Sequence, residues 1–237
     1  MDGLTSVAAI LAILAGLGGL AGLANRAAFK PGWLGVTLLL LLVDDALLTN
    51  AYGLLPGVLP GDLNWQGKGL ALIALLAIAV HPLFGWQEVG LTLRQKPGSL
   101  RGCLPVAGLY LAIFLGLALA FPNEPASAED LAFQLTMPGL EEELFYRGLL
   151  LFALNQALAG RVRLLGVEWG WGAALSSIAF GLAHAFSYGD GSWSFEPLYF
   201  ALTAGPAMLA VWLRELSGSL LLPLIVHNAG NLIPHLL

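Results

Sequence analysis

Four charged residues lie within seven positions of one otherwise apolar stretch. Positions 139–148 read Gly-Leu-Glu-Glu-Glu-Leu-Phe-Tyr-Arg-Gly, and they include Glu141, Glu142, Glu143 and Arg147. A charged side chain at the centre of a bilayer costs about 2.5–3.5 kcal/mol on insertion scales. Because stability alone would not retain such a cluster, we expect the chemistry of this chain to be centred on these residues.

Helical geometry assigns these charges to different faces. Glu143 and Arg147 are four residues apart, so they lie on one face and can form an ion pair along their own helix. Glu142 is turned about 100° away on an ideal helix and is free to face another group. Glu141 is nearest the expected helix entrance, and we expect it to be solvated.

Two further apolar stretches carry polar residues at the same spacing. Phe180 and His184 share one face of the first, and His227 and Asn231 share one face of the second. Buried polar groups must find partners. The simplest arrangement places the three helices side by side, so that Glu142, His184, His227 and Asn231 converge on one wet cavity.

The composition is typical of a multi-pass integral membrane protein. Of the 237 residues 58% are hydrophobic, 11% are charged, and the mean hydropathy is +0.80. Long apolar runs indicate membrane helices, whereas a transmembrane barrel would show short alternating segments. We therefore predict an all-α, polytopic membrane bundle of about eight transmembrane helices. The expected spans are 4–24, 31–50, 68–84, 102–121, 140–158, 169–186, 197–213 and 220–236.

The segments between the spans have their own signatures. Residues 131–137 are expected to form a short interfacial helix that ends at Pro138-Gly139, and residues 188–196 are expected to form a polar loop.

The net charge is −5, with no basic cluster for nucleic acid, and the single cysteine, Cys103, excludes an internal disulfide. Asp44 and Asp45, within the second span, are candidates for a second site.

The basic residues favour one orientation in the bilayer. Odd-numbered loops hold eight of them, even-numbered loops hold only Lys68, and Arg147 lies inside a span. The eight are Arg26, Lys30, Arg94, Lys96, Arg101, Arg161, Arg163 and Arg214. Under the positive-inside rule both termini face away from the cytoplasm. The expected cavity then opens toward the extracytoplasmic side of what we expect to be a prokaryotic plasma membrane.

The three polar patterns resemble those of the CPBP family, the CAAX-protease and bacteriocin-processing membrane proteins also called Abi proteins. The family motifs are Glu-Glu-x-x-x-Arg, here 142–147, Phe-x-x-x-His, here 180–184, and His-x-x-x-Asn, here 227–231. The resemblance covers roughly residues 100–237. It implies a catalytic transmembrane core at 101–237, preceded at 1–100 by three spans without a catalytic motif.

The resemblance implies an intramembrane endopeptidase that hydrolyses a membrane-associated protein or peptide, as in CAAX-type processing or bacteriocin maturation. In the family the first glutamate and the second-motif histidine are thought to activate a water. Carried over to this chain, Glu142 is the general base and His184 its partner. His227 and Asn231 would stabilise the tetrahedral intermediate. A carboxylate in an apolar cavity suits the role of base, and preorganised donors suit that of oxyanion stabiliser.

The remaining motif residues, Glu143 and Arg147, are implied to fix the geometry of the site. The implied mechanism needs no cofactor. The alternative is a zinc ion held by Glu142, His184 and His227, a plausible ligand set, although the chain has no His-Glu-x-x-His sequence.

Three function classes stay open at this level. The first is the endopeptidase, and the second is a non-catalytic bacteriocin-immunity or membrane-binding protein of the same family. The third is a proton-coupled transporter that uses Asp44, Asp45 and Glu142, although the inverted repeats typical of transporters are not seen. Eukaryotic family members that trim CAAX proteins act on the cytosolic face, so either this chain cuts other substrates or its orientation is reversed.

Overall fold

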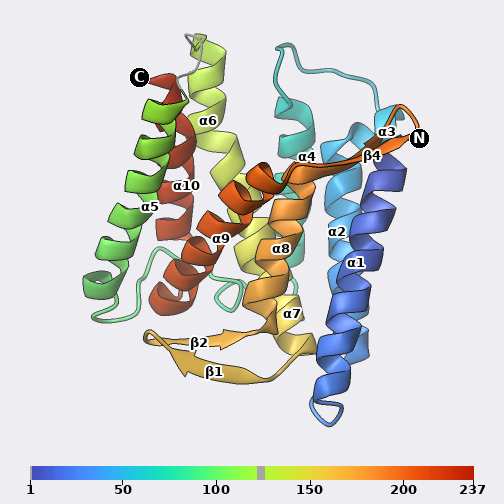
Figure 1. The fold of residues 1–237 in the computed structure, drawn as a ribbon, viewed down its shortest axis with the longest axis vertical. Coiled ribbons are helices and arrows are strands. Elements are labelled where there is room, and N and C mark those ends of the chain that lie inside the picture. The colour runs from blue at the N-terminus through green and yellow to red at the C-terminus, as the bar shows by residue number, and fades with distance from the viewer. Residues whose placement is uncertain (1, 122–125) are drawn as a thin grey trace.

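The chain folds into a bundle of helices with two small β-hairpins, as the computed structural model of residues 2–121 and 126–237 describes (Figure 1). The helices of the first half are α1 (Asp2–Ala24), α2 (Pro31–Leu48), α3 (Asn50–Gly53), α4 (Trp65–Ala79) and α5 (Leu100–Ala120). The elements of the second half are α6 (Ala128–Glu142), the π-helical η1 (Glu143–Leu150), α7 (Leu151–Ala157), β1 (Arg161–Leu164), β2 (Val167–Gly170), α8 (Trp171–Ala185), β3 (Phe186–Gly189), β4 (Ser192–Phe195), α9 (Pro197–Ser217), α10 (Leu221–Leu232) and the 3-10 turn η2 (Ile233–His235).

The mostly helical fold agrees with the predicted class, whereas the number of spans is supported only in part. Within the described residues three helices, α1, α2 and α5, are long and apolar enough to cross a membrane. The helices at the other five predicted positions are shorter or more polar, so those spans stay predictions. Large apolar side chains of the outer helices point away from the bundle, as contact with lipid requires: Leu20, Leu39, Ile73 and Leu119 are all at least 60% exposed.

The centre of the bundle is one continuous helical run from Ala128 to Ala157, made of α6, η1 and α7. α6 packs against α4 and α10, and η1 packs against α2, α4 and α8. Every residue of η1, including its charged ones, is buried. This run therefore carries the charged cluster through the middle of the protein rather than along its surface.

The predicted break at Pro138-Gly139 is wrong, because α6 continues through it. A proline inside a helix removes one backbone donor and normally kinks or ends the helix. Here the buried side chain of Asn228, on α10, bonds the backbone on both sides of Pro138. Its Oδ1 accepts from the Gly139 amide at 2.7 Å, and its Nδ2 donates to the Thr136 carbonyl at 3.3 Å.

The run begins at a capping box just before the predicted interfacial helix 131–137, and residues 122–125 lie outside the described part of the chain. The Ser127 hydroxyl accepts from the Asp130 amide at 3.1 Å, and the Asp130 carboxylate accepts from the Ser127 amide at 2.9 Å. Hydrogen bonds from Ser127 lower the pKa of Asp130 below its usual value. The box explains why α6 starts about one helical turn before the predicted interfacial helix.

Both β-hairpins were missed by the expected pattern of spans and loops. The predicted polar loop 188–196 contains the end of β3 and all of β4, which pair antiparallel with Gly189 opposite Ser192. Its turn residues Asp190 and Gly191 have φ of 51° and 77°, the left-handed values of a two-residue hairpin turn. The β1–β2 hairpin is closed in the same way by Leu165 and Gly166.

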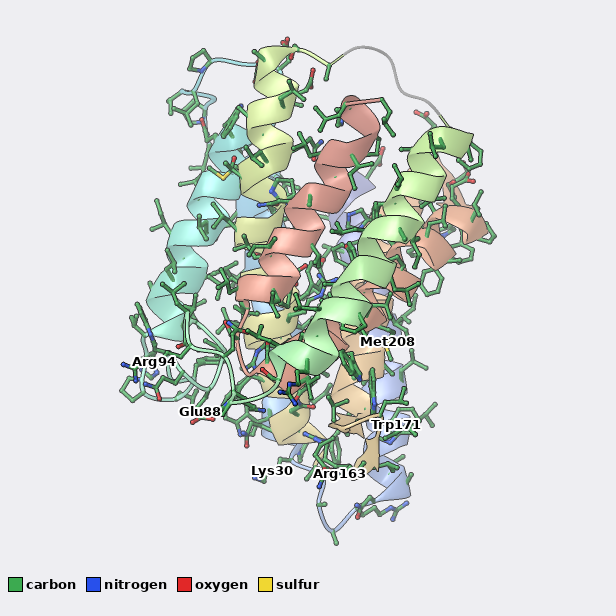
Figure 2. All side chains as sticks on the ribbon, turned by 90° about the vertical axis from the view of Figure 1, so that its left-hand side faces the viewer. Lys30, Glu88, Arg94, Arg163, Trp171 and Met208 are labelled. Carbon is green, nitrogen blue, oxygen red and sulfur yellow. The ribbon has the colours of Figure 1, made fainter. Side chains whose placement is uncertain are left out.

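The basic residues gather at one end of the bundle. Figure 2 shows Lys30, Arg94 and Arg163 there, and the β1–β2 hairpin lies at the same end, opposite both chain termini (Figure 1). This arrangement agrees with the uneven distribution of charge between odd and even loops. The orientation that the distribution implies stays a prediction.

Candidate active site

A cavity of about 440 Å³ lies within the bundle, and the side chains of Glu142, His184, His227 and Asn231 all line it. They come from α6, α8 and α10, so the structure brings together the four residues that the helical spacing predicts to converge. The rest of the lining is mostly apolar and aromatic. It comprises, among others, Tyr110, Phe114, Phe133, Pro138, Phe180, Leu202 and Pro206.

Glu142 has a partner that was not anticipated. Its Oε1 accepts from Nζ of Lys68, on α4, at 2.6 Å, while its Oε2 lies 3.5 Å from Nε2 of His227. We expected the partners of Glu142 to come from α8 and α10, which carry His184, His227 and Asn231. Lys68 lies at the start of α4, where Asn64 caps the helix by accepting from the Gly67 amide at 3.1 Å.

Glu141 was expected to be solvated, and this is wrong. It is fully buried, its Oε2 lies 2.5 Å from Nζ of Lys68, and its carboxyl group neighbours that of Asp44, on α2. The error follows from the predicted helix start at residue 140. Because the helix begins at Ala128, Glu141 lies deep within it rather than at its entrance.

Glu143 and Arg147 form the predicted ion pair, with Nη1 and Oε1 3.1 Å apart and both side chains buried. The same Glu143 oxygen lies 2.6 Å from Nδ1 of His227. The Arg147 guanidinium also lies over the ring of Phe180, 4.4 Å from its centroid, and the Phe180 ring packs on His184. The pair therefore contacts residues of the other two motifs.

Hydrogen bonds set the tautomers of both histidines. Nδ1 of His184 lies 2.7 Å from the Phe180 carbonyl. A carbonyl only accepts, so this nitrogen carries the proton, and in the neutral ring Nε2 then presents a lone pair. Nδ1 of His227 donates to Glu143, and its Nε2 faces Glu142. The Nε2 of His227 therefore accepts in the neutral ring and donates in the doubly protonated one.

The two asparagines of α10 have different surroundings. Asn228 is buried and bonded to α6, as described above. Asn231 lies one turn after His227 and lines the cavity. Within the described residues its amide has no hydrogen-bond partner, so it is available to a bound molecule.

The alternative zinc ligands Glu142, His184 and His227 line the same cavity, but two of them already have protein partners. Among the described residues no group of three or more His, Cys, Asp and Glu side chains is placed to hold a metal ion. The Lys68 ammonium bonds Glu142, and Glu143 bonds His227. One atom of Glu142 and one of His227 are thus held by protein partners, and we propose that the site works without a metal.

The residues predicted as a second site are divided by the structure. Asp44 is 3% exposed and neighbours Glu141, whereas Asp45 accepts from the Tyr52 hydroxyl at 2.8 Å. Lys68 was not predicted as a site residue, although it was the one basic residue outside the odd-numbered loops and Arg147. His235 also lines the cavity.

Comparison with known proteins yields one match. Residues 125–233 match the family described as type II CAAX prenyl endopeptidase Rce1-like. The matched segment is a little under half of the chain, and it contains all three motifs. No curated protein and no solved structure matches the chain. The match confirms the resemblance to the CPBP family and indicates a protease of the CAAX endopeptidase type.

Proposed function

We propose that this chain is an intramembrane endopeptidase that cleaves a membrane-associated protein or peptide with water activated by Glu142 and His184. The family matched by residues 125–233 supports the reaction class. The observation that carries the proposal is the convergence of Glu142, His184, His227 and Asn231 on one cavity. Six residues from the three motifs then have distinct tasks.

The first step is attack by water on the scissile carbonyl carbon. Glu142 takes one proton from the water through Oε2, and the Nε2 lone pair of His184 accepts a hydrogen bond from the same water. The oxygen of the tetrahedral intermediate receives hydrogen bonds from Nε2–H of His227 and from the Asn231 amide. Such preorganised donors usually supply the largest electrostatic contribution to catalysis.

The second step breaks the carbon–nitrogen bond. Glu142 passes the proton that it took from water to the departing amine, so one water is consumed and no other reactant is needed. Glu143 and Arg147 do not contact the substrate in this scheme. They hold His227 through the 2.6 Å contact between Nδ1 and Oε1 of Glu143 and keep its Nε2 directed at the cavity.

The lining of the cavity suits an apolar peptide segment. Aromatic and aliphatic side chains from α5, α6 and α9 surround the four polar groups. We propose a membrane-associated peptide or protein as the substrate, and a farnesylated CAAX peptide is the first probe to test because of the matched family.

The experiment that tests this function compares the peptides of cells that express the wild type with those that express Glu142→Ala. An uncleaved precursor that accumulates only with the variant identifies the substrate and supports the proposal. Identical peptide profiles, together with no cleavage of the farnesylated probe by the purified protein, would refute it.

Asn231→Ala is expected to lower kcat by about 10²–10³-fold, the usual cost of one lost oxyanion donor, and to leave KM almost unchanged. The measurement is the steady-state rate with the substrate identified above. Asn155→Ala is the matched control, since its amide makes only a 3.4 Å contact with Glu215, outside the cavity. A rise in KM at constant kcat would instead assign Asn231 to substrate binding.

Metal chelation is expected to leave the rate unchanged, because Glu142 and His227 are bonded to Lys68 and Glu143. The measurement is the cleavage rate after dialysis against a strong chelator such as 1,10-phenanthroline. A loss of activity that added zinc restores would favour the alternative in which Glu142, His184 and His227 bind the metal.

A further inference from the structure

Two charged residues from the first part of the chain, outside the segment matched to the family, reach the site. Lys68 lies on α4 and Asp44 on α2. The Lys68 side chain is 12% exposed, and its Nζ lies 2.5 Å from Glu141 Oε2 and 2.6 Å from Glu142 Oε1. A single buried ammonium thus joins two adjacent glutamates of the central helix.

Asp44, on α2, is a second neighbour of Glu141 besides Lys68. Asp44 Oδ1 and Glu141 Oε1 are buried, and neither has a hydrogen-bond partner as a carboxylate oxygen. A proton on one of these neighbouring groups would let them bond to each other, because two carboxylates have no donor between them. Lys68 already binds Glu141, so Asp44 is the one left without a cation of its own. The smaller cavity beside Asp44, of about 270 Å³, is lined largely by apolar residues, which include Val7, Leu41 and Phe145.

The glutamates of the site already outnumber the Lys and Arg cations that contact them. Lys68 bridges Glu141 and Glu142, and Arg147 pairs with Glu143. An ionised Asp44 would add a further buried negative charge without a cation of its own, which is costly in an apolar interior.

We propose that Lys68 is a positioning residue for Glu142, and that protonated Asp44 holds Glu141 so that the Lys68 ammonium bridges both glutamates. The bridge fixes Glu142 Oε1, keeps the side chain ionised and leaves Oε2 facing His227 and the cavity. This inference rests on the proposed role of Glu142 as the base. It makes α2 and α4 part of the active site rather than a passive support.

The charged groups around Glu142 come from every element packed against it. They are Lys68 on α4, His184 on α8, His227 on α10, Glu141 and Glu143 on its own helix, and Asp44 on α2 through Glu141. Lys68 is the cation in direct hydrogen-bond contact with Glu142. Its removal should therefore favour the protonated, inactive form of Glu142 at neutral pH.

The activity test uses the purified full-length protein and the substrate identified above. Lys68→Met is expected to lower the rate at neutral pH by ~10–100-fold, the range that a misplaced catalytic group costs. The acidic limb of its pH–rate profile should move to higher pH, and Lys68→Arg should restore part of the rate. Lys30→Met, exposed at the opposite end (Figure 2), is the control. An unchanged rate and profile in Lys68→Met would overturn the proposal.

Asp44 gives a second, sharper comparison. Asp44→Asn should keep most of the activity, because its amide can donate to Glu141 as the protonated acid does. Asp44→Leu, of similar size without a donor, should lose about tenfold or more. Equal loss in both variants would mean that the ionised carboxylate is required, which contradicts the proposal.

Infrared spectroscopy tests the same assignments without any substrate. The wild type should show the C=O stretch of a buried, protonated carboxyl group at neutral pH, and Asp44→Asn should lose it. Lys68→Met should gain a second such band that disappears when Glu142→Gln is added. A wild-type band that survives in Asp44→Asn, or a Lys68→Met band that survives with Glu142→Gln, refutes the inference. If the wild type cleaves nothing, the proposed function fails while these spectra still decide the role of Lys68.

Discussion

Glu142→Gln is expected to lower kcat/KM by about 10²–10⁴-fold, the range that general acid–base catalysis contributes. The amide is nearly the same shape, and its oxygen can still accept from Lys68, so the fold should be kept. It cannot take a proton from water, and the first step of hydrolysis is lost. The measurement is the cleavage rate of the identified substrate or the farnesylated probe, together with the thermal unfolding midpoint of each protein.

The matched control for this substitution is Glu168→Gln. Glu168 lies on β2 and is exposed, with only a 3.9 Å contact to Arg163, so the rate should not change. His184→Ala added to Glu142→Gln should cost little more than Glu142→Gln alone, because the two residues act on one water and their effects are not additive. A Glu142→Gln protein that is folded and fully active would remove Glu142 from the mechanism. An immunity phenotype that survives in it would favour the non-catalytic alternative.

The motif residues were predictable because their relations are local. Glu143 with Arg147, and His227 with Asn231, are four residues apart, and that spacing alone puts each pair on one helix face. The convergence of three such faces follows from the need of buried polar groups for partners. No property of distant segments is needed for this part of the argument, which is why the structure places Glu142, His184 and His227 around one cavity as expected.

The contacts from the first half of the chain were not predictable in the same way. Glu141 was misplaced because Pro138 was taken to end a helix, and nothing near it in the sequence shows that Asn228, far along the chain, bonds the backbone on both sides of Pro138. Lys68 and Asp44 reach the site only through the packing of α2 and α4. Lys68 was the one basic residue assigned to the even-numbered loops, but the charge distribution does not indicate which residues it contacts.

The hairpins are a different case, since one of them carried a readable signal. Asp190-Gly191 is a pair typical of tight two-residue hairpin turns, and aromatic residues on both sides favour strands. Because the segments on both sides are strongly apolar, residues 188–196 were predicted to be a loop between two spans. For Leu165-Gly166 the signal is weaker, because a leucine with positive φ is uncommon.

Arg147→Met is expected to be the most destabilising of these substitutions, by about 3–5 kcal/mol, the usual cost of removing one partner from a buried ion pair. It leaves Glu143 with a buried charge and removes the guanidinium from the face of Phe180. The measurement is the unfolding transition in detergent, with Arg163→Met, on the exposed hairpin, as the control.

The double variant Glu143→Gln/Arg147→Met separates charge from structure. It leaves no unpaired charge at this position, and the oxygen of the new amide can still accept from Nδ1 of His227, so it should recover most of the stability that Arg147→Met loses. It should not recover the activity, because a neutral amide oxygen is a weaker acceptor than the Glu143 carboxylate and holds Nδ1 of His227 less firmly. Recovery of both would mean that the buried pair serves the fold alone, whereas recovery of neither would place the cost of Arg147→Met in its packing on Phe180.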